Sequence, residues 1–326
     1  MCREPARACT ARHFGFWISD FGLKGRPLRG PRGAGRPLRG SGGVGGLLLA
    51  GLLVFMTGCP PAASIAPTSR LEALQRVNDN VARVSQPVQC NGLVSFKFRD
   101  AKNKEHTFVA CDAGLAFQAP RSLLFDVRHL GGVMAQFGSN AERYWVWTDV
   151  PDVRKLWWGE WRRIAAAAPG KLPIPPDALL DALMLRPLPE SLEGAQLPVL
   201  RMEGDDQRLL FVRLGVDRQP AGLREIRLDP REPYQPLEII DRLPDGAVAM
   251  RAYLSDYRRI GADGPLTPRR YVVYWPESGA EMRLDILKAA LRSDLPADVF
   301  EFPAGWRSES EQIDAPPGGR PGLEKP

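Results

Sequence analysis

The residues that could do chemistry in this chain are few. After residue 58 the only histidines are His106 and His129, and the only cysteines besides Cys59 are Cys90 and Cys111. The two histidines do not have the spacing of paired metal ligands, and no base can be assigned to either cysteine that would make it a nucleophile. The G-x-S-x-G elbow of hydrolases is absent, as is a phosphate-binding glycine loop followed by Lys. The sequence therefore predicts no catalytic residue, no metal, no cofactor and no enzymatic activity.

The two cysteines of the body raise the question of a disulfide. If residues 101–104 (AKNK) form the turn of a regular hairpin, Cys111 lies opposite Val94 and Cys90 opposite Leu115. The cysteines are then four residues apart, about 13 Å at ~3.4 Å per residue, while a disulfide needs Cα atoms within ~7 Å. We expect no bridge, although a bulge or a longer loop would close the gap.

The most specific signal is the tetrapeptide Met56-Thr57-Gly58-Cys59, which ends an uncharged run that begins at Val44. This run is shorter than the ~20 residues that span a bilayer, but it has the length of the apolar core of a signal peptide. A buried core helix is the alternative, and the glycines before the run and the Pro-Pro after it disfavour it.

Residues 56–59 resemble the lipobox of a bacterial lipoprotein signal. The resemblance implies that residues 44–58 are the signal, that the chain is cleaved before Cys59, and that Cys59 is acylated and holds the protein on a membrane. Residues 59–67 (CPPAASIAP) then form a tether. The location implied is the cell envelope, facing the periplasm, and Pro60 favours the outer over the inner membrane by analogy with lipoprotein sorting.

The basic character of the chain belongs to its first residues. The net charge is +6, but residues 1–58 hold nine of the 44 Lys and Arg and two of the 38 Asp and Glu, which leaves 35 bases and 36 acids for the remainder. The body is therefore close to neutral, and we expect no nucleic-acid partner. Residues 1–43 are a Gly-, Arg- and Pro-rich leader, which is either a disordered basic tail or a stretch preceding a true start near Val44.

The body reads as strands with two helices. Residues 68–86 have an apolar helical stripe with Thr68 or Ser69 as N-cap, and residues 176–185 form a second short helix. Between and after them, short segments of alternating apolar and polar residues are separated by Gly, Pro, Asn and Asp, a pattern typical of an antiparallel meander. The fold class expected is mainly β (α+β), a curled antiparallel half-barrel of about a dozen strands with the two helices as its lid. This domain spans residues 68–306, and residues 307–326 are expected to be a disordered tail.

The order of these elements resembles the LolA/LolB superfamily of periplasmic lipoprotein carriers. The segments that carry the resemblance are CNGLVSFKFRD, LAFQAPRSLLFDV, RYWVWTDV…KLWWGEW, LREIRLDP…PLEIIDRLPDG, LSDYRRI and LPADVFEFPAGW. The resemblance implies a half-barrel whose apolar hollow, closed by helices, holds acyl chains.

Two groups of side chains are candidates for lining such a hollow, one on the first strands and one on an aromatic strand. Both have an alternative interpretation as ordinary sheet core, which for the tryptophans is the preferred one. The candidate cavity-lining residues are Val94, Phe96, Phe98, Val109, Leu115, Phe117, Phe125, Trp145 and Trp147.

The function predicted is non-catalytic binding or transfer of lipid or lipoprotein acyl chains by a membrane-anchored periplasmic lipoprotein. The alternative is an envelope scaffold or sensor that uses the same fold to bind a protein partner. A continuous hollow under the helices would favour the first, and a filled core with an exposed apolar patch the second. Large side chains filling the space between helix 68–86 and the sheet would count against the first.

Overall fold

A computed structural model describes residues 69–315, apart from residues 101, 151–152, 167–171, 173, 190–197, 204–205, 215–218 and 304–308. The leader, the signal, the lipobox with Cys59 and the tether all lie outside these residues. In chain order, the elements are α1 (Arg70–Ala82), β1 (Val88–Arg99), β2 (Glu105–Gln118), β3 (Ser122–His129), β4 (Gly132–Ser139), β5 (Arg143–Thr148), β6 (Lys155–Glu160), the 3-10 helix η3 (Trp161–Ala166), α2 (Pro176–Ala182), β7 (Val199–Glu203), β8 (Asp206–Leu214), β9 (Pro220–Leu228), β10 (Pro236–Arg242), β11 (Val248–Ser255), β12 (Arg258–Arg259), β13 (Leu266–Thr267), β14 (Arg270–Trp275), β15 (Ala280–Leu291), the 3-10 helix η4 (Ala297–Phe300) and β16 (Ser310–Gln312).

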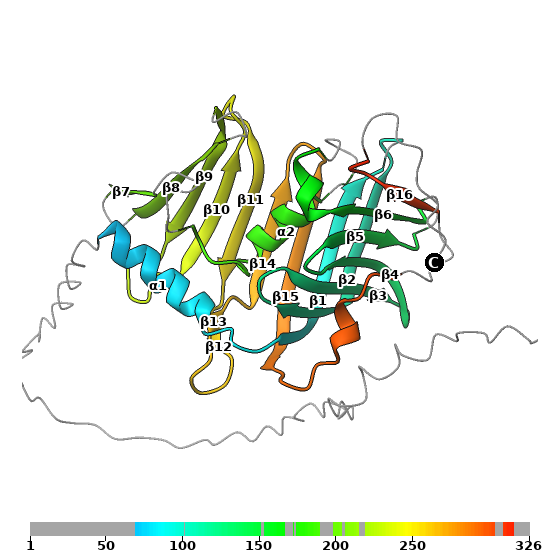
Figure 1. Ribbon diagram of the computed structural model, residues 1–326, viewed down its shortest axis with the longest axis horizontal. Coiled ribbons are helices and arrows are strands. Elements are labelled where there is room, and N and C mark those ends of the chain that lie inside the picture. The colour runs from blue at the N-terminus through cyan, green and yellow to red at the C-terminus, as the bar shows by residue number, and fades with distance from the viewer. Residues whose placement is uncertain are drawn as a thin grey trace, which may run out of the picture. The chain divides into compact units, whose positions relative to one another are not determined.

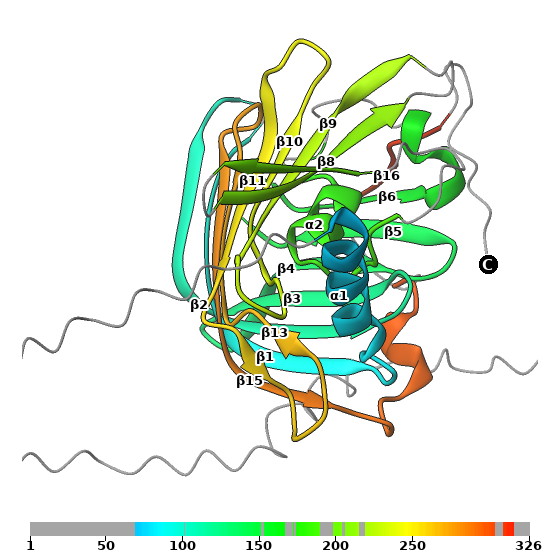
Figure 2. The same ribbon diagram turned by 90° about the vertical axis from the view of Figure 1, so that its left-hand side faces the viewer.

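One sheet of 14 strands contains every strand except the β12–β13 pair (Figure 1). Strands β1 to β6 follow one another as antiparallel neighbours, as do β7 to β11, β14 and β15, and β15 returns to pair with β1. The sheet curls but does not close, since β7 and β16 are its two edges. Figure 2 shows α1 and α2 on the concave side of this curl. The predicted half-barrel with two helices is confirmed.

The hairpin of β1 and β2 keeps the predicted register at one end and loses it at the other. Cys90 pairs with Leu115 and Val94 with Cys111, as expected, but the register then shifts and Phe96 pairs with Phe108. The extra residue sits at Ala110, whose φ is +52° and whose N–H donates to the Ser95 hydroxyl. Such a bulge reverses which side chains face inward on the rest of the strand. Both cysteines are free thiols, so the expectation of no bridge is confirmed.

Helix α1 packs a small apolar stripe against the sheet. Ser69 is the N-cap, and its hydroxyl accepts a hydrogen bond from the Glu72 N–H at 3.1 Å. Ala73, Leu74 and Val77 are buried, whereas Leu71, at the first turn of the predicted stripe, is 59% exposed. Among the described residues, no helix is long and apolar enough to cross a membrane.

The C-terminal segment is more ordered than predicted. Strand β16 pairs with β6 in parallel, and the next two residues, Ile313 and Asp314, are buried. The Asp314 carboxylate accepts a hydrogen bond from the Glu160 N–H at 2.6 Å. The prediction of a disordered tail was therefore wrong for residues 309–315, because polar composition hid a strand that completes the edge of the sheet.

Candidate functional site

The floor of the candidate site is an aromatic cluster on the concave face of β1, β3 and β4. Phe96, Phe125 and Phe137 lie with ring centroids 5.9–6.1 Å apart. The register explains this cluster, because Phe125 pairs with Phe137 across β3 and β4, and directly opposed side chains share a face. Phe125 is fully buried, while Phe96 and Phe137 also border open space.

That open space is a hollow of about 1230 Å³ between the concave face and the segment leading into α2. It exceeds the ~300–1,000 Å³ of ordinary small-molecule pockets. The apolar side chains on its wall come from both halves of the sheet and from the segment before α2: Phe96, Phe98, Phe108, Val127, Met134, Phe137, Val146, Val150, Trp157, Leu172, Ile174, Leu243, Met250 and Trp275. A cavity of this size and lining suits a long apolar ligand.

Charged residues stand at the rim of the hollow. At the tip of the β1–β2 hairpin, the Asp100 carboxylate lies 3.0 Å from His106 Nε2, and this hydrogen bond holds the pKa of Asp100 below its usual range. On the other side, the Lys155 ammonium lies 2.7 Å from Glu311 and 3.2 Å from Glu309 of the C-terminal segment. The hydrogen bond that the Lys155 ammonium donates to Glu311 contributes most to raising the pKa of Lys155. These pairs make the rim polar, whereas most of the interior wall is apolar, with Asp177, Arg213 and Asp241 as charged residues that also line it.

Helix α2 is fixed to the sheet by a cluster of charges that we call the α2 anchor: Asp181, Arg186, Arg224 and Asp241. The Arg224 guanidinium lies 2.6 Å from Asp181 of the helix and 2.7 Å from Asp241 of β10. Burial alone would raise the pKa of Asp181, but the guanidinium groups of Arg224 and Arg186 outweigh it and hold that pKa below its usual range. The anchor sits beside the hollow, because Asp241 also lines it.

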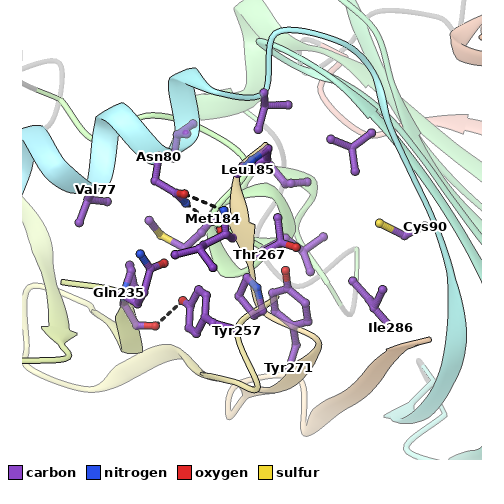
Figure 3. Close-up of a pocket in the computed structure, with 18 of the residues that line it drawn as sticks. Val77, Asn80, Cys90, Met184, Leu185, Gln235, Tyr257, Thr267, Tyr271 and Ile286 are labelled. Carbon is purple, nitrogen blue, oxygen red and sulfur yellow. Dashed lines mark hydrogen bonds between the residues drawn. The ribbon is translucent and has the colours of Figure 1, made fainter. Parts of the chain in front are cut away.

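The space between α1 and the sheet, in contrast, is nearly filled. A pocket of about 60 Å³ remains there, with Val77 and Asn80 of α1 on one side and Cys90, Tyr257, Tyr271 and Ile286 around it (Figure 3). Burial raises the pKa of the Cys90 thiol to about 12, so this sulfur stays protonated. The space under the first helix is therefore packed, which counts against an acyl pocket at that place, and the open hollow lies beside α2 instead.

The structure divides the predicted lining residues into four groups. Phe96 and Phe98 line the hollow, and Leu115 lines the small pocket under α1. Val94, Phe117 and Phe125 are packed in the core with at most 1% of their surface exposed.

Val109, Trp145 and Trp147 were wrong as lining residues. Val109 is 70% exposed, because the bulge at Ala110 turns Phe108 inward in its place. Trp145 and Trp147 alternate with Val146, which pairs with Phe137 and lines the hollow, so they lie on the opposite face of β5. There Trp145 packs edge-on against Phe302 and donates to Gln136 at 3.2 Å.

The second half of the hollow was not predicted from the sequence. Met250 and Trp275 lie on β11 and β14, in segments that alternate as plainly as the first strands. Alternation identifies the inward residues of each strand. It does not show that β15 pairs with β1, which is the pairing that brings the two halves of the sheet around one space.

Comparison with known proteins yields structural likeness alone. No family model and no curated protein matches this chain. A LolA superfamily protein from Nitrosomonas europaea is 13% identical, with 70% of this chain and 97% of that one covered and a TM-score of 0.43. A DUF1329 family protein from Desulfovibrio piger is 12% identical, with coverage of 72% and 98% and a TM-score of 0.46.

At these identities and TM-scores, the likenesses carry no argument about what the chain binds. The class of protein is defined by its own fold, an open antiparallel half-barrel with helices on the concave face and an apolar hollow beside α2. This is the fold that the resemblance to the LolA/LolB superfamily implied.

Proposed function

We propose that this protein is a membrane-anchored lipoprotein of the cell envelope that binds acyl chains of lipids or lipoproteins in the hollow, without catalysis. The observation that carries the proposal is the apolar hollow of about 1230 Å³. When an apolar ligand enters a space walled by Phe, Met, Val and Trp side chains, apolar surface is removed from water. This burial stabilises the complex by ~25 cal/mol per Å² of surface buried. The charged rim leaves the polar end of such a ligand in water.

Filling the hollow tests the proposal. Ala135 lines it and is half-buried, so Ala135→Trp places an indole in the space that a ligand would occupy. The matched control is Val109→Trp, which adds the same indole to an exposed position on a neighbouring part of the sheet. The full-length chain, freed of detergent, is titrated with a fluorescent C16 fatty-acid probe and examined by native mass spectrometry for bound lipids.

We expect the wild type and Val109→Trp to bind the probe alike, and Ala135→Trp to bind it at least about tenfold more weakly. Equal binding by all three chains, or none by the wild type, would refute the proposal. Bound lipids in the wild type that are lost in Ala135→Trp would identify the natural ligand class.

The anchor has a separate test, which rests on the lipobox residues. Cys59→Ser removes the only sulfur that the lipobox resemblance acylates, and several buried chains contribute ~0.8 kcal/mol per methylene to membrane binding. We expect Cys59→Ser to leave the membrane fraction and lose incorporation of labelled palmitate, while Cys90→Ser keeps both. Retention of label by Cys59→Ser would contradict the anchor.

A further inference from the structure

Three soft donor atoms meet on strands β2, β3 and β4. The Cys111 sulfur lies 3.9 Å from Nδ1 of His129 and 3.9 Å from the Met134 sulfur. The three residues are separated by 18 and 5 positions in the sequence, and no metal-binding motif spans them. Their meeting is a property of the fold.

The strand register brings the first two donors together. Asp112 pairs with Arg128 across β2 and β3, so the next positions, Cys111 and His129, lie opposite one another. Leu130 and Gly131 join β3 to β4 with φ of +49° and +84°, the geometry of a tight hairpin turn, which fixes the position of His129.

The third donor is placed by an irregularity. The register of β3 and β4 shifts between Val127 and Arg128, so Met134 is the extra residue of a bulge. Its side chain reaches the Cys111 sulfur and also lines the hollow. Bulges re-aim side chains in this way and often do so at functional sites.

Both separations from the Cys111 sulfur fit a metal ion shared with its neighbour. Bonds of ~2.3 Å to sulfur and ~2.0 Å to an imidazole nitrogen, at angles of ~110–120°, leave donors ~3.5–4.0 Å apart. A thiol that only fills core space is surrounded by carbon atoms, whereas Cys111 has a ring nitrogen and a thioether as neighbours. Cys111 is 2% exposed and His129 is exposed, so an ion can enter from the His129 side without unfolding the sheet.

We propose that Cys111, His129 and Met134 form a binding site for a soft monovalent metal ion, Cu(I). Thiolate and thioether ligands select Cu(I), and an imidazole suits copper as well. Zinc prefers four ligands and rarely a thioether, and within the described residues no three His, Cys, Asp or Glu side chains form a metal-binding group. Binding replaces the thiol proton of Cys111 with the ion, so one proton is released and no electron is transferred.

The test is competition for Cu(I) held by the chromogenic chelator bathocuproine, under reducing anaerobic conditions with the full chain. The Cys111→Ser variant removes the central donor, and Met134→Leu removes the thioether while keeping the side-chain volume. The matched control is Cys90→Ser, a buried thiol on the same strand pair. Whichever of Cys2, Cys9 and Cys59 the prepared protein retains as a thiol is the same in every variant, so its copper binding cancels in the comparison.

We expect the wild type and Cys90→Ser to withdraw one more equivalent of Cu(I) than Cys111→Ser. Met134→Leu should hold that equivalent at least about tenfold more weakly, and copper X-ray absorption should show sulfur and nitrogen neighbours. The proposal is overturned if Cys111→Ser and Cys90→Ser withdraw the same amount, or if Met134→Leu, folded by circular dichroism, binds as the wild type does.

Discussion

At the scale of single residues, Gly138 shows how closely the convex face is packed. Gly138 pairs with Trp145, and a Cβ added there would lie 2.1 Å from Cε2 of the indole. We expect Gly138→Ala to displace Trp145 and lower the free energy of unfolding by ~1–3 kcal/mol, the usual cost of overpacking. Urea unfolding measures it. Gly114→Ala is the control, because its Cβ meets nothing within 4 Å, and it should be neutral or stabilising. Similar losses in both variants would contradict this.

Arg224 is a buried charge, and its ion-pair partners are essential to the stability of the fold. Its guanidinium satisfies two carboxylates, those of Asp181 and Asp241. Arg224→Met leaves both without their main partner, and we expect a loss of ~3–5 kcal/mol in the free energy of unfolding. Arg231→Met breaks a pair with Asp229 at a site where the Arg231 side chain is 76% exposed, and should leave the free energy of unfolding almost unchanged. A small loss in the Arg224 variant would show that the cluster does not stabilise the fold.

The same cluster gives the fold a pH dependence. Because the folded-state pKa of Asp181 lies below its usual value, its ionised form stabilises the fold above the unfolded pKa of ~3.9, and this stability is lost as the pH falls through the folded pKa. We therefore expect the difference in unfolding free energy between the wild type and Asp181→Asn to be largest near pH 7 and to shrink below about pH 4. A difference that does not change with pH would assign the effect to packing alone.

At the scale of elements, α1 is held by side-chain amides as much as by its apolar stripe. Asn78 exchanges two hydrogen bonds with the backbone of Leu188, at 2.9 and 2.8 Å, and Asn80 does the same with Leu266 at 2.8 Å each. Asn78→Ala leaves the Leu188 backbone groups unpaired, which costs ~1–3 kcal/mol. We expect faster hydrogen exchange in α1, and no change for Gln75→Ala on the exposed side of the helix. Unchanged exchange in Asn78→Ala would show that apolar contacts suffice.

The elements themselves could be predicted from the sequence, but their irregularities could not. Alternation and turn residues gave the strands, and the turn position gave the register of Cys90 and Cys111. A bulge depends on one residue adopting an unusual backbone conformation that its residue type does not predict. Ala110 is an example, because it is not a glycine and yet has a positive φ. One such residue moved Val109 to the outside, and another at the β3–β4 bulge brought Met134 to Cys111. The lining of the hollow was therefore predicted only in part.

At the scale of the molecule, the hollow depends on contacts between distant parts of the chain. Strand β15 pairs with β1, which curls the two meanders around one space, and the segment before α2 covers part of it. Where α1 lies, the concave face is packed, and beside α2 it is open. A sequence pattern cannot distinguish these two ends, because the strands present apolar side chains at both of them, such as Val88 and Leu115 at one end and Phe96 and Val127 at the other. The volume between a sheet and its helices is set by where the helices are anchored.

The C-terminal segment completes both the sheet and the rim, and its removal should affect the whole molecule. Residues 309–314 cover the edge of β6 through the Glu309 carbonyl, the Ile313 N–H and the Asp314 carboxylate. The side chains of Glu309 and Glu311 also form ion pairs with Lys155 at the rim of the hollow. Deleting residues 309–326 leaves β6 as an unpaired edge, the kind of edge that pairs with other chains. We expect this variant to form dimers or larger species by light scattering and to unfold at lower urea concentration. Deleting only residues 316–326 keeps β16 and should leave the chain monomeric and as stable as the wild type, so the same behaviour in both truncations would refute a structural role for β16.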